Sequence, residues 1–520
     1  MPELGLRKVI ITLTVVAAAI IELIDTSIVN VALSDMSGNL GATLEDVAWV
    51  VTAYAIANVI IIPMTSFLAA RFGRRPYYIG SILLFTAASM ACGQAHNIWE
   101  LVIFRFIQGI GGGALLSTSQ TILFETFPLE QRGFAAALFG IGVIIGPTIG
   151  PTLGGWIIDN YTWPWIFYIN LPIGIGAAIL ASIYVREPEQ ARSASHIDWT
   201  GIVLLVAGLG SLQTVLERGE TEDWFSKPYI VVLAVVAAVS LVAFVGWELT
   251  TKHPVVDLRV LRSRPLATAA TLTFVLGFAL FATVFIVPVF AQRLLDFTAM
   301  QTGMLFLPGA VVSVAVLPFV GRALVKGLPP QYLVVTGFAV IALFAFQLSR
   351  LDLSSGAQDF FWPIMLRAFG LSFMFVPLAQ LAVSGLRPRD IPQGVALNNM
   401  MRQVGGSFGI AAINTYLDHR IARNRLDLVT RLVPGDPATA LRLRQLTHNM
   451  LAHGYSAWEA PRRALAALEF MVERQASLLS YLDAFRLIAL VALGCVPVIL
   501  FAGRPKSTAR AAAEVGASAH

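Results

Sequence analysis

Runs of apolar residues, each long enough to cross a bilayer as a helix, follow one another along almost the whole chain. A spanning helix needs about 20 mostly apolar residues, because each residue adds about 1.5 Å along the helix axis. The runs cover residues 9–33, 46–70, 76–94, 98–123, 134–158, 163–184, 197–217, 229–249, 266–291, 300–325, 331–349, 360–384, 394–417 and 481–503. They predict an all-α polytopic membrane protein with fourteen transmembrane helices.

Composition excludes most other classes of protein. Hydrophobic residues make up 57% of the chain and charged residues 13%, whereas soluble domains have about 25% charged residues. The net charge of +5 is too small to suggest nucleic-acid binding. Cys92 and Cys495 lie far apart in apolar runs, so we expect neither a disulfide framework nor a metal site. The sequence has no phosphate-binding loop and no nucleophile motif, so ATP-driven transport and enzyme activity are unsupported.

The positions of Lys and Arg predict the orientation in the membrane. With the N-terminus in the cytoplasm, about 18 of them fall on cytoplasmic segments and about four on short outer loops. An even number of spans returns the C-terminus to the cytoplasm, where we expect residues 504–520 to form a disordered tail. The first run follows Arg7 and Lys8 as a signal peptide would, but its length and its acidic residues predict a retained helix.

One outer segment, residues 418–480, is much longer than the other outer loops. It contains nine arginines and no lysine, and turn residues divide it near Pro434 and Pro461. Leu, Ala and Met recur at helical spacing in residues 438–451 and 462–479. We therefore expect helices that project from the membrane, the last continuous with the final span. Two readings stay open, a solvated surface and a docking surface for a partner.

A pair of acidic residues lies inside the first span. Glu22 and Asp25 are three residues apart, so both carboxylates lie on one helical face. A charge at this depth costs several kcal/mol and normally faces a protein interior or a water path. Two such carboxylates should not both ionise easily, which is the behaviour of a proton carrier. The alternative is that one acid lies near the aqueous end of its helix and is only solvated.

Three arginines lie inside other spans. Arg105 in the fourth run cannot shed its charge, so it needs an acid or a set of carbonyls, and Asp25 or Glu22 would supply that partner. An exchangeable pair suits a proton-coupled switch, while a fixed pair would only set the helix register. Arg367 and Arg402 fit structural or gating roles better, because an arginine does not titrate in this range.

Glycine and proline dominate the fifth span. Glycines at a spacing of four allow close helix contact, and prolines remove backbone donors. Such a helix can move against its neighbours without opening a packed core. The residues concerned, with Gly140 and Gly142 before them, are Gly146, Pro147, Gly150, Pro151, Gly154 and Gly155.

Together these stretches resemble the major facilitator superfamily, and within it the fourteen-span drug:proton antiporters of the EmrB/QacA type. Residues 23–33, with Asp25 and Asn30, are similar to the signature of the first span, although Ser34 replaces the usual proline. Residues 101–113, with Arg105 and Gln108, are similar to the fourth-span motif. The glycine-rich stretch 142–155 resembles the antiporter motif, and residues 165–174 and 398–409 are similar to stretches of the EmrB branch.

One motif of the family is incomplete. The loop after the second span keeps Arg71, Gly73 and Arg74, but Ser66 and Ala70 stand where glycine and aspartate are usual. This departure puts a charge lock at that loop in doubt.

The resemblance implies two six-helix bundles related by a pseudo-twofold axis, with two further helices inserted between them and substrate bound near the midplane. We expect an N-terminal bundle at 1–195, the inserted helices at 196–250, a cytoplasmic linker at 251–259 and a C-terminal bundle at 260–503 that includes the periplasmic helical extension 418–480. Asp25, Glu22 and Arg105 are the proton-coupling candidates, and the loop motif and the glycine stretch are conformational candidates. Candidates for the substrate cavity are Asn30, Gln108, Asn398 and Arg402.

The implied function is proton-driven efflux of hydrophobic or amphipathic compounds across a bacterial inner membrane, powered by the proton gradient without a cofactor. The implied partners are membrane lipid, a periplasmic membrane-fusion adaptor and an outer-membrane channel, and no nucleic acid. Export of one endogenous metabolite, such as a fatty acid or siderophore, is an alternative on the same fold. A membrane scaffold or sensor that does not transport is an alternative of another class.

Overall fold

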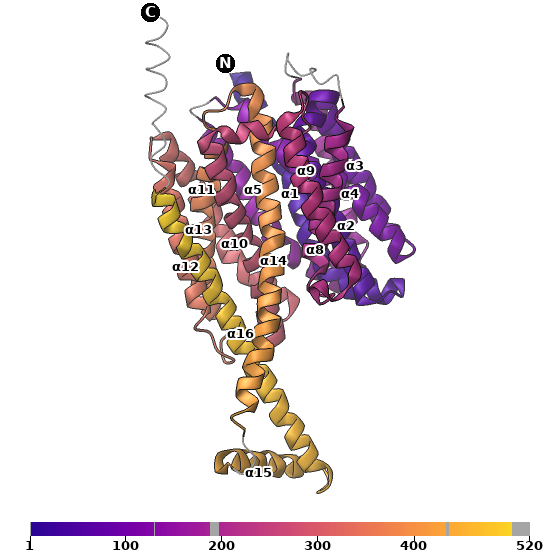
Figure 1. The fold of residues 1–520 in the computed structure, drawn as a ribbon, viewed down its shortest axis with the longest axis vertical. Helices are drawn as coiled ribbons and strands as arrows, with labels where there is room; N and C mark the ends of the chain where they lie inside the picture. The colour runs from indigo at the N-terminus through magenta and orange to yellow at the C-terminus, as the bar shows by residue number, and fades with distance from the viewer. Residues whose placement is uncertain (1, 129–130, 188–196, 433–435, 502–520) are drawn as a thin grey trace, which may run out of the picture.

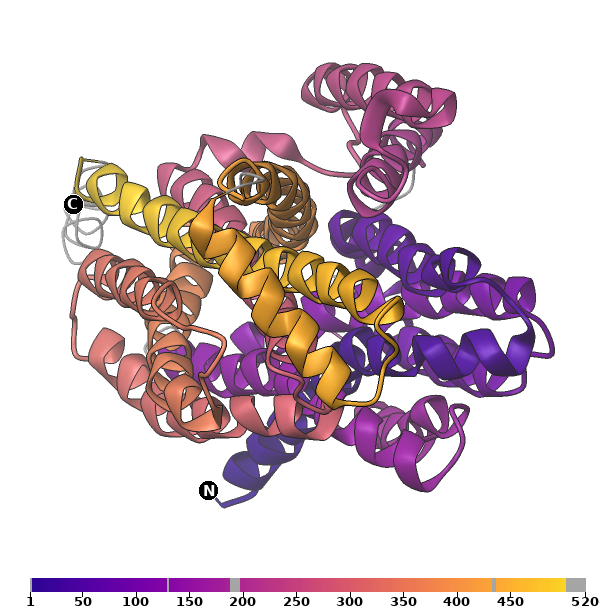
Figure 2. The same cartoon turned by 90° about the horizontal axis from the view of Figure 1, so that it is seen from below.

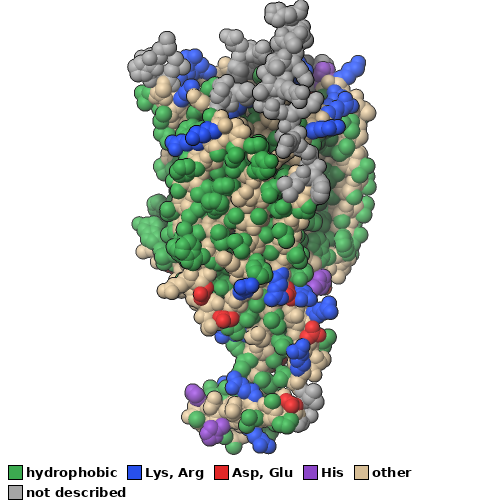
Figure 3. All heavy atoms as spheres, turned by 90° about the vertical axis from the view of Figure 1, so that its left-hand side faces the viewer, with side chains coloured by type: hydrophobic (Ala, Val, Ile, Leu, Met, Phe, Trp, Pro, Cys, Tyr) green, Lys and Arg blue, Asp and Glu red, His purple; other side chains and the backbone are tan. Residues whose placement is uncertain are grey.

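The computed structural model describes residues 2–128, 131–187, 197–432 and 436–501. The predicted disordered tail, residues 504–520, lies outside the described residues. Within them every regular element is a helix, so the all-α prediction is confirmed. On the face drawn in Figure 3, apolar side chains form a broad belt across the helices, and Lys and Arg side chains gather beyond it at both ends.

The helices before the predicted linker form two groups. We call the first seven the N-terminal helices: α1 (Pro2–Leu40), α2 (Leu44–Phe72), α3 (Arg74–Gly93), α4 (Ile98–Thr126), α5 (Arg132–Asn160), α6 (Trp165–Tyr168) and α7 (Asn170–Tyr184). Next come α8 (Trp199–Arg218), η2 (Trp224–Ser226) and α9 (Pro228–Thr250). Polar residues begin several helices; Thr43, for example, accepts a hydrogen bond from the Asp46 N–H (3.1 Å).

The remaining long helices, α10 to α16, are called the C-terminal helices. They are α10 (Arg264–Leu294), α11 (Ala299–Val325), α12 (Pro330–Leu348), α13 (Ala357–Val383), α14 (Ile391–Val429), α15 (Pro437–Ala452) and α16 (Glu459–Phe501). Two short 3₁₀ helices, η3 (Leu258–Arg262) and η4 (Pro388–Asp390), precede α10 and α14.

Thirteen segments of the described chain are long and apolar enough to span a membrane, with α6 and α7 counted as one. The remaining predicted run, residues 394–417, lies inside α14, which is helical throughout but carries too many polar side chains to meet the same measure. α14 is enclosed by α10, α16, α2, α4 and α8, so its polar residues face other helices. The exact number of fourteen spans therefore stays a prediction.

Both groups of helices repeat the same packing. Counted as spans, α1 and α5 are the first and fifth of the N-terminal helices, and α10 and α14 are the first and fifth of the C-terminal helices. Each first span packs closely on its fifth, and each fifth span also packs on the second span of the other group, α5 on α11 and α14 on α2. A pseudo-twofold arrangement requires this repetition. α8 and α9 pair with each other, and α8 packs beside α2 and α14.

Two helices continue far beyond the apolar belt and form a projection (Figure 1). α14 runs to Val429, and α16 is a single helix from Glu459 into the last span. Arg425 pairs with Glu469 between them (2.8 Å), and Asn424 donates to Ser480 (2.9 Å). α15 lies across the tip, as the view from below in Figure 2 also shows. The helical stretches in this segment thus lie where the residue spacing predicts them.

Candidate functional site

The acidic pair of α1 is buried where α1 meets α2, α4 and α7. Glu22 is 3% exposed and Asp25 is fully buried. The residue spacing places both on one helical face, but the structure gives them different partners. Asp25 points toward α4 and α7, and Glu22 toward α2.

Asp25 forms the centre of a closed polar cluster. Arg105 of α4 donates from Nη1 to Asp25 Oδ2 (2.5 Å) and to Gln108 Oε1 (2.7 Å). Asp25 Oδ1 accepts hydrogen bonds from Gln108 Nε2 (3.0 Å) and Asn170 Nδ2 (2.9 Å). Ser89 Oγ accepts from the same two amides at 3.1 and 3.0 Å. Both carboxylate oxygens are therefore satisfied, and the predicted contact between Asp25 and Arg105 is present.

The Arg105 guanidinium is sealed from solvent on its other sides. Its Nε donates to the Val50 carbonyl (3.3 Å), and its plane lies over the Tyr54 ring, 4.2 Å from the centroid. Removing one partner from such a buried pair costs about 3–5 kcal/mol, because the other charge is left without compensation. The pair thus holds α1 and α4 together, and losing either member would be costly.

Glu22 is only half satisfied. Its Oε1 accepts from Asn58 Nδ2 (2.9 Å) and lies 3.5 Å from the Tyr54 hydroxyl. Its buried Oε2 has no hydrogen-bond partner among the described residues. The two acids of α1 therefore differ in how completely they are held.

The predicted cavity candidates do not form one site. Gln108 belongs to the Asp25 cluster, and Asn30 is exposed on α1. Asn398 and Arg402 of α14 are buried. Within the described part of the chain, Asn398 Oδ1 and Arg402 Nε and Nη1 have no hydrogen-bond partner. Arg367 of α13 donates to Thr283 (2.8 Å) but has no acidic partner among the described residues.

The glycine-rich helix α5 packs directly on the helix that carries the acids. A Cβ added at Gly146 would lie 2.6 Å from Leu23 Cβ, and one at Gly154 would lie 2.8 Å from Ile28 Cγ1. Gly150 meets Ser27 in the same way. The stripe thus allows close contact between α1 and α5, and α5 is one continuous helix through Pro147 and Pro151, with Gly155 buried near its end.

The loop motif after α2 has acidic partners that its own sequence lacks. Gly73 adopts φ of +90°, a conformation that favours glycine and turns the chain from α2 into α3. Glu187 accepts hydrogen bonds from the N–H groups of Arg74 (2.8 Å) and Arg75 (2.9 Å). Arg74 also pairs with Glu125, while Arg71 is exposed. Acids from distant segments therefore surround the loop where Ala70 provides none.

Several partners of the site were not predicted as site residues. Asn58, Tyr54, Ser89 and Asn170 all bond to the acids or to their neighbours. Asn58 and Asn170 are polar residues inside apolar runs, which is a signal that sequence inspection can find. Ser89 gives no such signal, because serine is common in spans. Among the described residues, no group of three or more His, Cys, Asp or Glu side chains could hold a metal ion.

A second pair of acids lies outside the spans. Glu220, after α8, lies beside Asp418 of α14 and accepts from Asn414 Nδ2 (3.4 Å). Partial burial, and then the neighbouring Asp418, raise the pKa of Glu220 to about 7. Trp224 donates to Thr415 nearby (2.9 Å), so this loop fastens the inserted helices to α14.

Comparison with known proteins identifies the class. The model of the Major Facilitator Superfamily matches residues 15–410, so the chain belongs to this superfamily of membrane transporters. The multidrug export protein EmrB of Escherichia coli K12 is 34% identical over 86% of this chain and 87% of its own length. EmrB of Haemophilus influenzae is 32% identical over 98% of both chains. The predicted family of EmrB type is thus confirmed.

Two further similarities are informative in different ways. The fatty acid resistance protein FarB of Neisseria gonorrhoeae is 32% identical over 83% of this chain and 85% of its own. The crystal structure of the human organic anion transporter MFSD10 (TETRAN) has a TM-score of 0.56, covers 93% of this chain and 99% of its own, and is 12% identical. At that identity it supports the fold alone.

Proposed function

We propose that the protein is a proton-coupled exporter of hydrophobic and amphipathic compounds across the bacterial inner membrane. The observation that carries this proposal is the buried pair of Asp25 and Arg105, which joins α1 to α4 inside a transporter fold. A buried acid with a permanent cation beside it favours the charged acid, and a proton that reaches the acid removes that attraction. Proton binding therefore changes the energy with which α1 is held.

In the proposed cycle a proton enters from the outer side and neutralises Asp25 or Glu22. When Asp25 takes the proton, Arg105 loses its charged acceptor and keeps the uncharged Gln108 and Val50 carbonyl, so its attraction to α1 weakens. The two bundles, 1–195 and 260–503, rock about the midplane and open the substrate site to the other side. The membrane potential supplies about 2.3 kcal/mol per 100 mV for each net charge that crosses, so it helps to drive the exchange of one proton for a neutral compound. The exchange of one proton for a monovalent cation moves no net charge and is driven by the pH gradient.

Of the predicted cavity residues, Asn398 and Arg402 of α14 are the ones we propose to meet substrate, and no cofactor beyond the proton gradient is needed. Asn398 and Arg402 bring buried polar atoms without partners, which a substrate could satisfy. Transport, not catalysis, is the activity that this arrangement supports.

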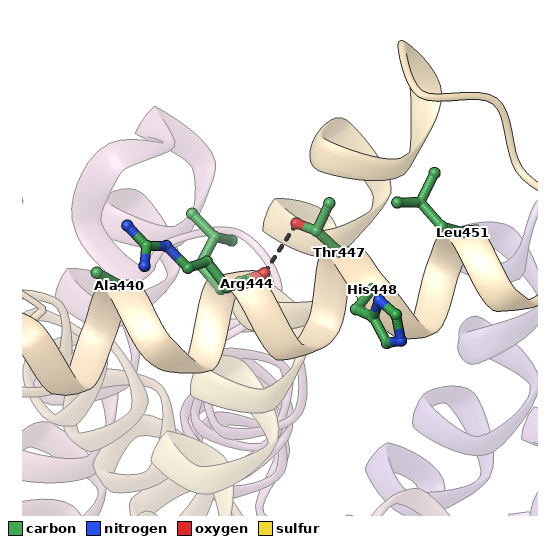
Figure 4. A pocket seen from close by; sticks show the side chains of 6 residues that line it. Ala440, Arg444, Thr447, His448 and Leu451 are labelled. Carbon is green, nitrogen blue, oxygen red and sulfur yellow. Dashed lines mark hydrogen bonds between the residues drawn. The ribbon is translucent and has the colours of Figure 1, made fainter.

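We place both termini in the cytoplasm and the projection of α14, α15 and α16 in the periplasm. There it would meet a membrane-fusion adaptor and, through it, an outer-membrane channel. Residues 418–480 hold nine arginines and six acidic residues, so the projection carries excess positive charge. Figure 4 shows a shallow hollow on one face of α15, lined by Ala440, Leu443, Arg444, Thr447, His448 and Leu451. Replacing α15 with a Gly-Ser linker is expected to remove resistance in cells and to leave transport in liposomes unchanged.

Export of a single endogenous amphiphile is the second candidate. The similarity to a protein named for fatty acid resistance favours it. A scaffold or sensor built on the projecting helices is the candidate of a different class. Deleting the gene in its host and measuring both drug susceptibility and intracellular metabolites separates drug export from metabolite export.

Ethidium accumulation in cells that lack other efflux pumps tests the proposal. Cells that express the protein should hold less ethidium than control cells, and a protonophore should abolish the difference. Equal accumulation with a panel of cationic, neutral and acidic amphiphiles would count against multidrug export and in favour of the other candidates.

A further inference from the structure

Two buried charged groups on opposite sides of the molecule's central interface are left incomplete. Glu22 of α1 is 3% exposed and its Oε2 has no hydrogen-bond partner among the described residues. Arg402 of α14 is 2% exposed, and its Nε and Nη1 likewise have none there. A buried polar atom without a partner is costly, so each of these groups needs an interaction that this conformation does not supply.

The two groups interact electrostatically with each other. Arg402 is the cation that acts on Glu22, and Glu22 is the acid that acts on Arg402. They form no direct ion pair in this conformation, because no nitrogen of Arg402 lies within 4.0 Å of a carboxylate oxygen of Glu22. A movement of α14 toward α1 would make the contact that this conformation lacks.

The surroundings of Glu22 contain few other charges. Asp25 follows it on α1, and α2 contributes Tyr54 and Asn58. α4 approaches with Gly112, whose added Cβ would lie 3.4 Å from Glu22 Cγ, and its Arg105 is bonded to Asp25. α5 meets α1 through glycines. Arg402 is thus the charged side chain of the C-terminal helices that interacts electrostatically with Glu22.

The charges of Glu22 and Asp25 therefore act on different parts of the molecule. The counter-ion of Asp25 is Arg105, which belongs to the same group of helices, so the Asp25 charge acts within that group. α14 instead packs on α2 and α4, and Asn399, three residues before Arg402, donates to Gln120 of α4 (2.9 Å). The charge of Glu22 therefore acts between the two groups.

We propose that Glu22 and Arg402 form a proton-controlled ion pair between the N-terminal and C-terminal helices. Ionised Glu22 attracts Arg402 and draws α14 toward α1, and a proton taken from water onto the Glu22 carboxylate releases Arg402. The chemical step is a proton transfer between water and one carboxylate oxygen. The inference rests on the proposed function, because it assigns the link between proton binding and bundle movement to this pair.

The test measures the distance between the two groups of helices as the pH changes. Spin labels are placed at His96→Cys, in the exposed turn between α3 and α4, and at Gln358→Cys, exposed at the start of α13, with Cys495 replaced by alanine. Pulsed electron paramagnetic resonance on the full chain in lipid nanodiscs then gives the distance distribution. No substrate is needed, so the result does not depend on whether the protein exports ethidium.

In the otherwise unchanged protein the distribution should shift between mildly acidic and mildly alkaline pH. Glu22→Gln and Arg402→Gln should each abolish the shift, the double variant should behave like either single one, and Arg402→Lys should retain it. Glu217→Gln, which removes a half-buried acid of α8, is the matched control and should retain it.

Two outcomes would overturn the proposal. One is a pH-dependent shift that persists in Glu22→Gln, and the other is no shift in the otherwise unchanged protein. Arg402→Lys keeps the test valid if Arg402→Gln does not fold, because a retained charge must then preserve the response. If only the proposed function fails, the results differ: the protein would not transport ethidium, but the distance between the spin labels would still change with pH and Glu22→Gln would still abolish that change.

Discussion

The N-terminal and C-terminal helices share a packing plan but treat their buried charges differently. In the N-terminal helices Asp25 and Arg105 neutralise each other within a closed cluster. In the C-terminal helices Arg367 and Arg402 are equally buried, and the described residues offer neither of them a direct acidic partner. A charge that is paired within one group of helices stabilises the packing of that group. An unpaired charge can gain a partner only from the other group or from a ligand.

The close contact between first and fifth spans shows that the difference lies in charge and not in backbone arrangement. Gly146 and Gly150 bring α5 onto α1, and Gly277 and Gly409 bring α10 and α14 together in the same way. A Cβ at Gly409 would lie 2.9 Å from the Phe278 Cα. The same scaffold therefore carries an acid–base cluster on one side and lone guanidinium groups on the other.

Removing the acid from the closed cluster should have the largest effect. In Asp25→Asn, Arg105 loses its anion, so we expect resistance to fall to the level of cells without the protein. Stability should fall by about 3–5 kcal/mol, while expression in the membrane continues. Ethidium resistance and the unfolding temperature in detergent measure the two effects. Asp159→Asn, at an exposed site on α5, is the control, and normal transport by Asp25→Asn would refute the assignment.

Removing a buried charge from the C-terminal helices should not destabilise the protein. Arg367→Met takes away a buried cation that has no direct acidic partner among the described residues, and Thr283 keeps its own bond to the Ala279 carbonyl (2.6 Å). We expect unfolding to become about 1–4 kcal/mol less favourable or to stay unchanged. Thermal unfolding in detergent measures it. A loss of stability as large as that of Asp25→Asn would erase the contrast between the two groups.

A bulky residue in the glycine stripe should loosen the shared scaffold. Gly150→Val would push against Ser27 and the Ile24 carbonyl, which lies 3.1 Å from the added Cβ. Overpacking of this kind costs about 1–3 kcal/mol. Gly176→Val on α7 is the matched control, because nothing lies within 4 Å of its added Cβ. Equal unfolding temperatures for the two variants would show that α1 and α5 do not need this contact.

We expect the smallest effect on stability from a substitution in the loop that connects the inserted helices to α14. The folded protein raises the pKa of Glu220 from 4.5 to about 7, because burial and Asp418 disfavour its charge. Between these values the folded chain binds a proton that the unfolded chain releases, so stability falls as pH rises through this window. Glu220→Gln should flatten that part of the profile of unfolding temperature against pH.

Glu222→Gln is the control for that experiment, since Glu222 pairs with Arg218 (3.2 Å) and not with Asp418. It should leave the decline between pH 4.5 and about 7 unchanged. A profile of Glu220→Gln that matches the unmodified protein would show that the contact with Asp418 does not control the attachment.

The sequence predicts the closed cluster better than it predicts its surroundings. Asp25 and Arg105 are conspicuous because a charge in an apolar run is costly and must be paired. Asn58 and Asn170 are uncharged and cost much less to bury, so they mark polar sites in their runs but not their partners, and Ser89 gives no signal at all. Residue spacing places Glu22 and Asp25 on one face, but it cannot show that they turn to different helices, since that depends on tertiary packing.

The fold shows the same limit. Hydropathy locates the spans because lipid exposure requires apolar surface, and all thirteen candidate segments match predicted runs. α14 departs from the rule because other helices enclose it and accept its polar side chains. The division at residues 195, 250 and 260 stays a prediction.

Proton movement in proteoliposomes tests the central claim most directly. The purified protein is reconstituted with a pH-sensitive dye inside the vesicles, and ethidium is added outside without a preset gradient. We predict a proton flux opposite in direction to ethidium that is present with the unmodified protein and absent with Asp25→Asn. Ethidium movement without any proton flux, or the same flux from Asp25→Asn, would contradict the account.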